Sequence, residues 1–396
     1  MYREKVAGRV RVSRLQEQRI AAGHLWVYAG EIEAVEGAPT PGDLVDLTSD
    51  SGRFWARGFF NPHSKIRVRI LTFQDESINE EFWQTRLQQA VSLRNRVVSD
   101  TNAYRLVHAE GDLLPGLIVD RYADVLVMQT LSVGMDRRKE LLADLLSRLT
   151  GAGTVYLRND ASSRRLEGLP VGRGFLRGHA ETRIGIYEGP ARFRVDVAHG
   201  QKTGWFCDQR ENRMAAAALA RGAEVLEVFC HTGAFGIHAA LQGAASILGL
   251  DSSGEAISLA REHAERNKVG TLCEYRQVDA FEELPKYERA GHQYGMVILD
   301  PPAFARSRDS VPRALAGYKE INLRGLRLLR PEGFLVTCSC SYHVSEQGLW
   351  RAILEAAQDA KRRVRLLEVR SQARDHPMLA SMLETRYLKC FILQTL

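Results

Sequence analysis

The sequence has no long apolar run and no paired cysteines. No uninterrupted apolar segment reaches the roughly 18 residues that suggest a transmembrane helix, and the charged first residues, MYREKVAGRVRVSRL, do not resemble a signal peptide. The six cysteines include no CxxC pair, which argues against a zinc ribbon, and six in 396 residues do not indicate a secreted disulfide framework. These absences predict a cytoplasmic protein without a metal site and without a membrane partner.

Neither sign of charge is present in large excess. The chain carries 54 basic and 48 acidic residues, a net charge of +6, and 45% of its residues are hydrophobic. These values are ordinary for a globular protein and argue against wholesale disorder. At roughly 100–200 residues per domain, the length predicts two or three domains. The slight basic excess favours a polyanionic partner without identifying one.

The patterns along the chain predict three regions. Residues 1–74 read as short strands and turns, typical of a small β-barrel. Residues 75–185 mix strands with helices and form an α+β region. In the last region, residues 186–396, strands alternate with helices from residue 222 on, which predicts a parallel, doubly wound, Rossmann-like sheet whose ligand binds at the carboxyl ends of the strands. The expected helices lie at 76–100 and 136–149, and the main expected strands at 9–14, 44–52, 65–72, 117–122, 124–130, 154–160, 224–229, 246–251, 296–300 and 333–340.

A glycine-bearing loop follows the first strand of the last region. The segment EVFCHTGAFGIHAA (residues 227–240) places Gly233 just before a helix, where backbone N–H groups can approach a ligand closely. It does not match GxGxxG, which weakens a dinucleotide interpretation. Three acids at successive strand ends, Glu227, Asp251 and Asp279, could hold an adenosine by its ribose and base, although a single acid there is more often a helix cap. Together they predict S-adenosylmethionine as the ligand.

The segment ILDPPAFARS (residues 298–307) follows a later strand of the same region. Its two prolines stiffen the backbone after Asp300, which fixes a carboxylate and an exposed ring, Phe304, beside the cofactor. A planar base could stack on that ring while polar groups read its edge. The alternative is a rigid turn without chemistry.

Two cysteines lie in the segment LVTCSCSYH (residues 335–343). Cys338 and Cys340 are two residues apart on one expected strand, so their side chains should share a face. Strand cysteines are usually inert core residues. A thiolate at the carboxyl end of this strand could nevertheless reach a base held over Asp300, and Cys340, closer to the loop, is the expected nucleophile.

The ordered set of cofactor loop, DPPAF and TCSCS resembles class I S-adenosylmethionine-dependent RNA methyltransferases. The segment HLWVYAGEIEAVEG…ARGFFNPHSKIRVRILT resembles a PUA domain, a small RNA-binding barrel. YRLVHAEGDLLPGLIVDRY is similar to the central domain of bacterial 23S rRNA cytosine-C5 methyltransferases with an N-terminal PUA domain, and GQKTGWFCDQRENR resembles the segment leading into their cofactor domain. The resemblance covers nearly the whole chain. It implies a PUA-like RNA-binding domain at 1–74, a central α+β domain at 75–185 and a methyltransferase domain at 186–396.

The resemblance also implies roles for individual residues. The nucleophilic thiol of the family maps to Cys340 and the acid of its D-P-P motif to Asp300, while Cys338 matches the Thr-Cys-Ser pattern of other RNA cytosine methyltransferases and stays an alternative nucleophile. Those other enzymes carry a second cysteine where this chain has Pro302 and Ala303, so a base that the sequence does not name must remove the carbon-5 proton. The expected substrate contacts are Lys202, Pro301 and Phe304. The expected cofactor-binding residues are Phe206, Asp208, Arg210, Phe229, Cys230, His231, Thr232, Gly233, Phe235, Asp251, Ser252, Asn267, Asp279, Ala280, Asp300 and Pro302.

The sequence therefore predicts methylation of carbon 5 of a cytidine in 23S rRNA, through a covalent cysteine adduct and with S-adenosylmethionine as cofactor. Methylation of a guanine or adenine nitrogen, which needs no thiol, and a non-catalytic RNA-binding factor are the alternatives. Three basic segments, residues 1–19, 158–194 and 361–370, could contact the RNA backbone, although solvated surface is the expected role of the third. A homodimer is left open as the assembly.

Overall fold

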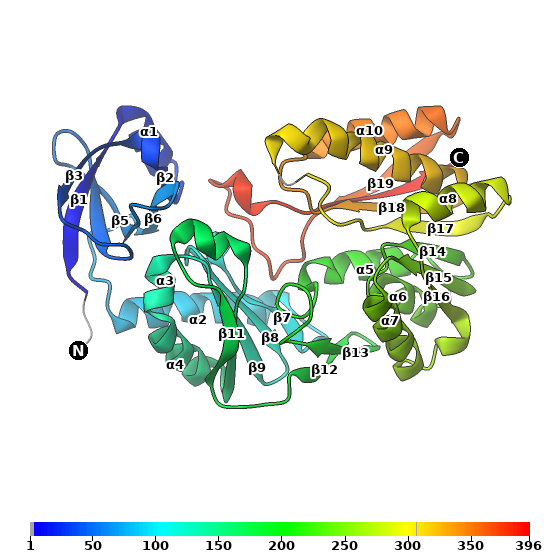
Figure 1. Cartoon of the computed structure of the whole chain (residues 1–396), viewed down its shortest axis with the longest axis horizontal. Helices are drawn as coiled ribbons and strands as arrows, with labels where there is room; N and C mark the ends of the chain where they lie inside the picture. The colour runs from blue at the N-terminus through cyan, green and yellow to red at the C-terminus, as the bar shows by residue number, and fades with distance from the viewer. Residues whose placement is uncertain (1–3, 306) are drawn as a thin grey trace. The chain divides into compact units, whose positions relative to one another are not determined.

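The computed structural model describes residues 4–305 and 307–396 (Figure 1). Residues 1–3, the start of the first basic segment, and residue 306 of the 298–307 segment lie outside the described residues. The chain forms two compact units. The first comprises Met1–Ile186, Arg194–Cys207 and Arg374–Thr385, and the second comprises Tyr187–Phe193, Asp208–Ala373 and Arg386–Leu396. No helix in the described ranges is long and apolar enough to cross a membrane.

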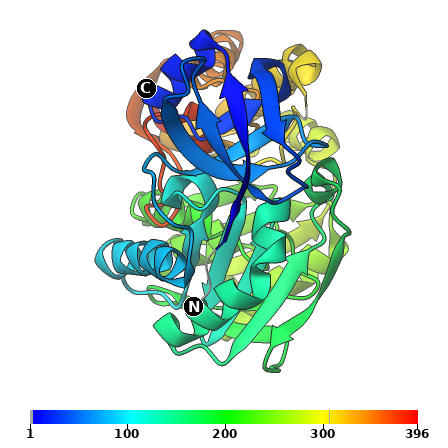
Figure 2. The ribbon, with the colours of Figure 1, turned by 90° about the vertical axis from the view of Figure 1, so that its left-hand side faces the viewer.

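The first unit begins with a six-stranded sheet of order β2-β6-β5-β4-β1-β3, whose strands face the viewer in Figure 2. The strands expected at 9–14, 44–52 and 65–72 are confirmed, because alternate apolar residues such as Val10 and Val12 point into one core. The first strand ends where Ser13 caps the following helix. The elements are β1 (Val6–Val12), α1 (Arg14–Ala21), β2 (Trp26–Tyr28), β3 (Ile32–Gly37), β4 (Leu44–Thr48), β5 (Phe54–Phe60) and β6 (Ile66–Thr72).

The rest of the first unit is α+β, as expected. Five strands in the order β11-β10-β9-β8-β7 pack against two long helices. The single helix expected over 136–149 is wrong at its start: Arg138, with φ −109° and ψ 7°, leaves the helical region and separates α3 from α4. Phe59 of β5 stacks on Trp83 of α2, with ring centroids 6.0 Å apart, and both belong to one buried cluster with residues of the five-stranded sheet. The elements are α2 (Glu80–Val97), β7 (Ala103–His108), β8 (Leu117–Tyr122), β9 (Val125–Thr130), α3 (Val133–Arg137), α4 (Lys139–Thr150), β10 (Thr154–Asn159) and β11 (Gly172–Arg177).

The second unit is the doubly wound sheet that the sequence predicts. Its order is β16-β15-β14-β17-β18-β20-β19; β14 to β18 are parallel, and β20 is antiparallel to both of its neighbours. Helices α5, α6 and α7 cover one face and α8, α9 and α10 the other (Figure 1). The elements are α5 (Arg210–Ala217), β14 (Glu224–Val228), α6 (Ala234–Leu241), β15 (Ser246–Asp251), α7 (Gly254–Arg266), β16 (Cys273–Gln277), α8 (Ala280–Arg289), β17 (Tyr294–Leu299), α9 (Val311–Arg327), β18 (Leu329–Ser339), α10 (Glu346–Asp359), β19 (Val364–Arg370) and β20 (Lys389–Thr395).

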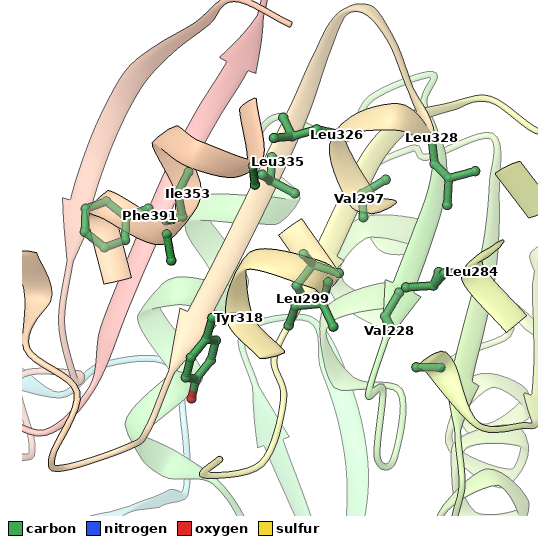
Figure 3. Packing of buried hydrophobic residues seen from close by; sticks show 14 of the residues in the cluster. Val228, Leu284, Val297, Leu299, Tyr318, Leu326, Leu328, Leu335, Ile353 and Phe391 are labelled. Carbon is green, nitrogen blue, oxygen red and sulfur yellow. The ribbon is translucent and has the colours of Figure 1, made fainter. Parts of the chain in front are cut away.

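The core of the second unit brings the central strands and their helices together. Leu299 of β17 and Leu335 of β18 pack with Tyr318 of α9, as Figure 3 shows. Both strands therefore end at fixed positions, with Asp300 directly after one and Cys340 directly after the other. This packing holds the Asp-Pro-Pro loop and the cysteine segment at the same edge of the sheet.

A buried ion pair of the second unit links Glu188 to helices α5 and α6; Glu188 is the last residue of β12 (Arg183–Glu188), which pairs with β13 (Ala191–Asp196). The guanidinium of Arg213 on α5 donates to both carboxylate oxygens of Glu188, at 2.7 and 3.0 Å. His238 of α6 lies 3.3 Å from the same carboxylate. Although burial alone would raise the pKa of Glu188, Arg213 and His238 lower it to about 2. Glu188 therefore stays ionised and joins the helices on either side of the cofactor loop.

Candidate active site

The loop between β14 and α6 is tightly coiled. Phe229, His231 and Gly233 all have positive φ, of 61°, 49° and 74°. Two side-chain-bearing residues in this region of the backbone are uncommon, and such conformations cluster at functional sites. A Cβ at Gly233 would lie 2.4 Å from the hydroxyl of Tyr275, so the loop requires glycine there. The backbone at the start of α6 can accordingly approach a ligand closely, as the sequence predicts.

Glu227 fixes this loop from inside the sheet. Its buried carboxylate accepts the N–H groups of Phe235, at 3.2 Å, and Gly236, at 3.0 Å. Burial raises the pKa of Glu227 to about 8, against the opposing effect of these two hydrogen bonds. Glu227 therefore caps the first turn of α6 and does not face a ligand itself, which is the helix-cap alternative raised for a single acid.

Asp251 holds the same loop from the neighbouring strand. It is the last residue of β15; its Oδ2 accepts the N–H of His231 at 2.8 Å, and its Oδ1 accepts the N–H of Ser253 at 2.9 Å. Each carboxylate oxygen has a second lone pair, so a ribose hydroxyl could still be accepted. The structure thus brings Asp251 to the cofactor loop, where the sequence predicts it.

Asp279 and Asn267 differ in their placement. Asp279 is exposed and caps α8 by accepting the N–H of Phe281 at 2.8 Å, at the carboxyl end of β16. Asn267 instead follows the last residue of α7, a helix of 13 residues, or about 20 Å, that starts beside Asp251. Its side chain donates to the carbonyl of Arg192 at 2.6 Å. It also donates to the carbonyl of His263 at 2.8 Å, and the His263 ring lies 3.2 Å from the carbonyl of Thr232 in the cofactor loop, so a cofactor role for Asn267 stays a prediction.

Asp300 is held by Gln209, a residue outside the predicted site. The Nε2 of Gln209 donates to Oδ1 of Asp300 at 2.9 Å, and Oε1 of Gln209 accepts from Asn212 at 2.7 Å. Gln209 is almost fully buried. The pattern Asp-Gln-Arg before α5 was the available signal, because a buried amide beside a carboxylate fixes the direction in which the carboxylate points.

Aromatic rings gather around the Asp-Pro-Pro loop. Phe304 lies 6.0 Å from Phe281, 6.4 Å from Phe229 and 4.7 Å from Tyr318, measured between ring centroids. Phe304 is half-buried and Phe281 is 43% exposed, so the cluster presents ring surface. Pro301 is buried and Pro302 exposed. A flat base could be stacked here next to Asp300.

The two cysteines lie in different environments. Cys338 is fully buried opposite Cys390 of β20, and the neighbouring Cys390, burial and Asp300 all raise its pKa well above the ordinary value. Cys340 follows the last residue of β18, is half-buried, and its thiol lies 3.9 Å from the carbonyl oxygen of Pro301. The expectation that both cysteines lie on the strand is wrong for Cys340. Because reactive thiols are accessible and ionisable, the geometry favours Cys340.

The remaining predicted residues fall into two sets. In the second unit, Asp208 accepts the Tyr387 hydroxyl at 2.6 Å, and Arg210 is buried at the start of α5. In the first unit, the ammonium of Lys202 lies 4.5 Å from the ring centroid of Phe206. Around the loop and its neighbouring strand ends, the structure places Cys230, Thr232 and Ala280 as buried residues and Ser252 as an exposed one.

Comparisons with known proteins agree with this arrangement. Residues 10–73 match the model of a PUA-like domain, and residues 169–375 match that of an S-adenosylmethionine-dependent methyltransferase. Ribosomal RNA large subunit methyltransferase I of Tolumonas auensis is 38% identical over 387 residues, covering 96% of this chain and 98% of that protein. The same enzyme of Shewanella denitrificans is 38% identical over 390 residues, covering 97% and 98%.

Solved structures share the fold at low sequence identity. A proposed S-adenosylmethionine-dependent methyltransferase from Streptococcus mutans aligns with a TM-score of 0.83 at 20% identity, over 98% of this chain and 99% of that one. A second structure of a proposed methyltransferase, complexed with SAH, has a TM-score of 0.84 at 21% identity, with the same coverage.

Proposed function

The chain belongs to the S-adenosylmethionine-dependent methyltransferases, in the family of ribosomal RNA large subunit methyltransferase I, and on this premise we propose that it methylates carbon 5 of a cytidine in 23S rRNA. Its cofactor is S-adenosylmethionine and its substrate class is ribosomal RNA. The coiled loop around Gly233, with Asp251 at the adjacent strand end, suits the adenosine of that cofactor. We also propose the cytoplasm as the place of action.

The half-buried thiol of Cys340 beside the Asp-Pro-Pro loop is the observation that carries this proposal. Carbon 5 of cytosine is too weak a nucleophile to accept a methyl group directly. When the Cys340 thiolate adds to carbon 6, the ring becomes an enamine that is nucleophilic at carbon 5. A hydrogen bond from the ring edge to Asp300 would orient the base, and Phe304 would stack on it.

When bound, S-adenosylmethionine would supply the electrophilic methyl group that carbon 5 attacks, and S-adenosylhomocysteine would be the leaving group. The ring then loses its carbon-5 proton to a base, and elimination of the Cys340 thiolate restores the aromatic ring. No second cysteine stands at Pro302 or Ala303 to take this proton. The assignment of Cys340 as nucleophile and Asp300 as the base-orienting acid is part of the proposal.

Methylation of a guanine or adenine nitrogen is the second candidate function. It is favoured by the aromatic surface of Phe281 and Phe304, which would stack on any base, and it gives Cys340 no role. The two functions differ in the fate of one atom, because only methylation at carbon 5 removes the hydrogen from that carbon of cytosine. Release of this hydrogen therefore tests the proposed function.

We propose that exposed basic side chains of the N-terminal PUA-like domain contact the RNA backbone. Lys5, Arg9 and Arg14 are exposed, whereas Arg11 and Arg19 are paired with acids. Deleting residues 1–72 would be a poor test of this role, because Phe59 packs on the neighbouring α+β region. Point substitutions leave that contact intact. The domain boundaries near residues 74 and 185 and a homodimeric assembly stay predictions.

Replacing Lys5, Arg9 and Arg14 together by alanine should weaken rRNA binding and flatten its salt dependence. Each lost phosphate contact is expected to lower the slope of log affinity against log salt by about 0.7 to 0.9. Titration of rRNA fragments at several salt concentrations measures the slope, and calorimetry should show unchanged S-adenosylmethionine binding. An unaltered slope would remove this module from the RNA-binding surface.

A further inference from the structure

Lys389 is a buried lysine beside the proposed nucleophile. It begins β20 directly opposite Ser339, the last residue of β18, and is 5% exposed. Its ammonium donates to the carbonyl of Ser341 at 2.8 Å and to that of Tyr387 at 3.0 Å. Within residues 4–305 and 307–396, no carboxylate forms a salt bridge with it. Burial of an ammonium without a counter-ion costs free energy, so an anion that forms during function would explain its position.

Among neighbouring charged groups, Cys340 has the largest effect on the pKa of Lys389. Burial lowers the pKa of Lys389 to about 8, and the nearby Cys340 thiolate acts in the opposite direction. The other charged groups facing Lys389 are Arg386 and Glu346, which form a salt bridge with each other. Their opposite charges largely offset one another, which leaves Cys340 as the anion that Lys389 can stabilise.

The backbone on both sides of Cys340 is fixed by hydrogen bonds. The hydroxyl of Ser339 donates to that of Tyr318 at 2.8 Å, and the Tyr318 and Ser341 hydroxyls are 2.9 Å apart. Burial first, and the Cys340 charge among smaller effects, raise the pKa of Tyr318, which keeps this phenol neutral. Lys389, which is bonded to the carbonyl of Ser341, is therefore the cation that these hydrogen bonds hold near Cys340.

We propose that Lys389 is a positioning residue that stabilises the Cys340 thiolate before it attacks carbon 6. This inference rests on the proposed function, because it takes Cys340 as the nucleophile. An ordinary thiol has a pKa of about 8.5 and is mostly protonated at neutral pH. A fixed ammonium nearby favours the thiolate, and the thiol proton passes to solvent while Lys389 keeps its charge. The ion pair thus raises the fraction of Cys340 that is ready to react.

The test is the pH dependence of Cys340 alkylation by iodoacetamide, followed by mass spectrometry of the peptide that contains Cys340. In the wild-type protein the midpoint should lie below the ordinary thiol value of about 8.5. Lys389→Met should raise the midpoint by about one unit and slow alkylation at pH 7 about tenfold. Lys389→Arg keeps the charge and should stay near wild type. Lys286→Met removes an exposed lysine on α8 and should change nothing.

Two results would overturn the inference. One is a wild-type midpoint at or above 8.5, which needs no variant to fold. The other is a Lys389→Met protein that still binds S-adenosylmethionine in calorimetry and alkylates at the wild-type rate at every pH. Alkylation reports the ionisation of the thiol and needs no turnover, so it tests the role of Lys389 separately from the proposed function. A fully active Cys340→Ala enzyme would refute Cys340 as the nucleophile. An ordinary alkylation midpoint would refute only the role of Lys389.

Discussion

Cys340→Ala should reduce methyl transfer to rRNA by at least about a thousandfold while S-adenosylmethionine binding stays unchanged. The reason is that no other accessible thiol stands at this end of β18 among the described residues, and without an adduct at carbon 6 the cytosine ring does not become nucleophilic at carbon 5. Single-turnover transfer of a labelled methyl group to rRNA measures the loss. Calorimetry of cofactor binding shows whether the site is otherwise intact.

Cys338→Ala is the matched control. Cys338 packs in the core against Cys390, so its replacement should cost about 1 kcal/mol of stability or somewhat more and leave turnover close to wild type. An active Cys340→Ala enzyme together with an inactive but folded Cys338→Ala enzyme would contradict this assignment and move the nucleophile to Cys338.

Asp251→Ala should weaken S-adenosylmethionine binding by about a hundredfold. The carboxylate holds the cofactor loop through the N–H of His231, and it is also the group expected to accept a ribose hydroxyl. Hydrogen bonds to a charged group contribute about 1.5–3 kcal/mol each, so the loss of both contacts at the lower end of this range costs about 3 kcal/mol, or roughly two orders of magnitude in affinity. Isothermal calorimetry of cofactor binding provides the dissociation constant.

Glu255→Ala provides the comparison for Asp251→Ala. Glu255 is an exposed acid in the first turn of α7. Its replacement by alanine removes one negative charge near Asp251 but leaves the contacts of Asp251 with the cofactor loop in place. Its cofactor affinity should stay within about twofold of wild type. Equal losses in both variants would mean that general charge at this helix, and not the contacts of Asp251, sets the affinity.

Local patterns in the sequence were sufficient to predict the sheet and the meeting of its loops. Alternating or continuous apolar residues mark β14, β15, β17 and β18, and a parallel sheet necessarily collects their carboxyl ends at one edge. The sequence alone therefore predicts that Gly233, Asp251 and Asp300 lie near one another. The prediction depends on how few residues separate each of these side chains from the end of its strand.

Contacts between distant segments could not be predicted in the same way. Lys389 and Cys340 are 49 positions apart (389 minus 340), and only the antiparallel pairing of β18 with β20 brings Lys389 opposite Ser339. Gln209 reaches Asp300 only because α5 packs on the sheet. Such relations depend on tertiary packing, which local periodicity does not encode.

Tritium release from rRNA that carries [5-³H]cytidine tests the central claim most directly. The RNA is incubated with the enzyme and ¹⁴C-methyl-labelled S-adenosylmethionine, and tritium in water is compared with ¹⁴C in RNA. Methylation at carbon 5 replaces the hydrogen on that carbon, so one tritium should enter water for each methyl group transferred, and Cys340→Ala should release none. Transfer of ¹⁴C to the RNA without release of tritium would contradict the account, because the methyl group would then have gone to an atom other than carbon 5.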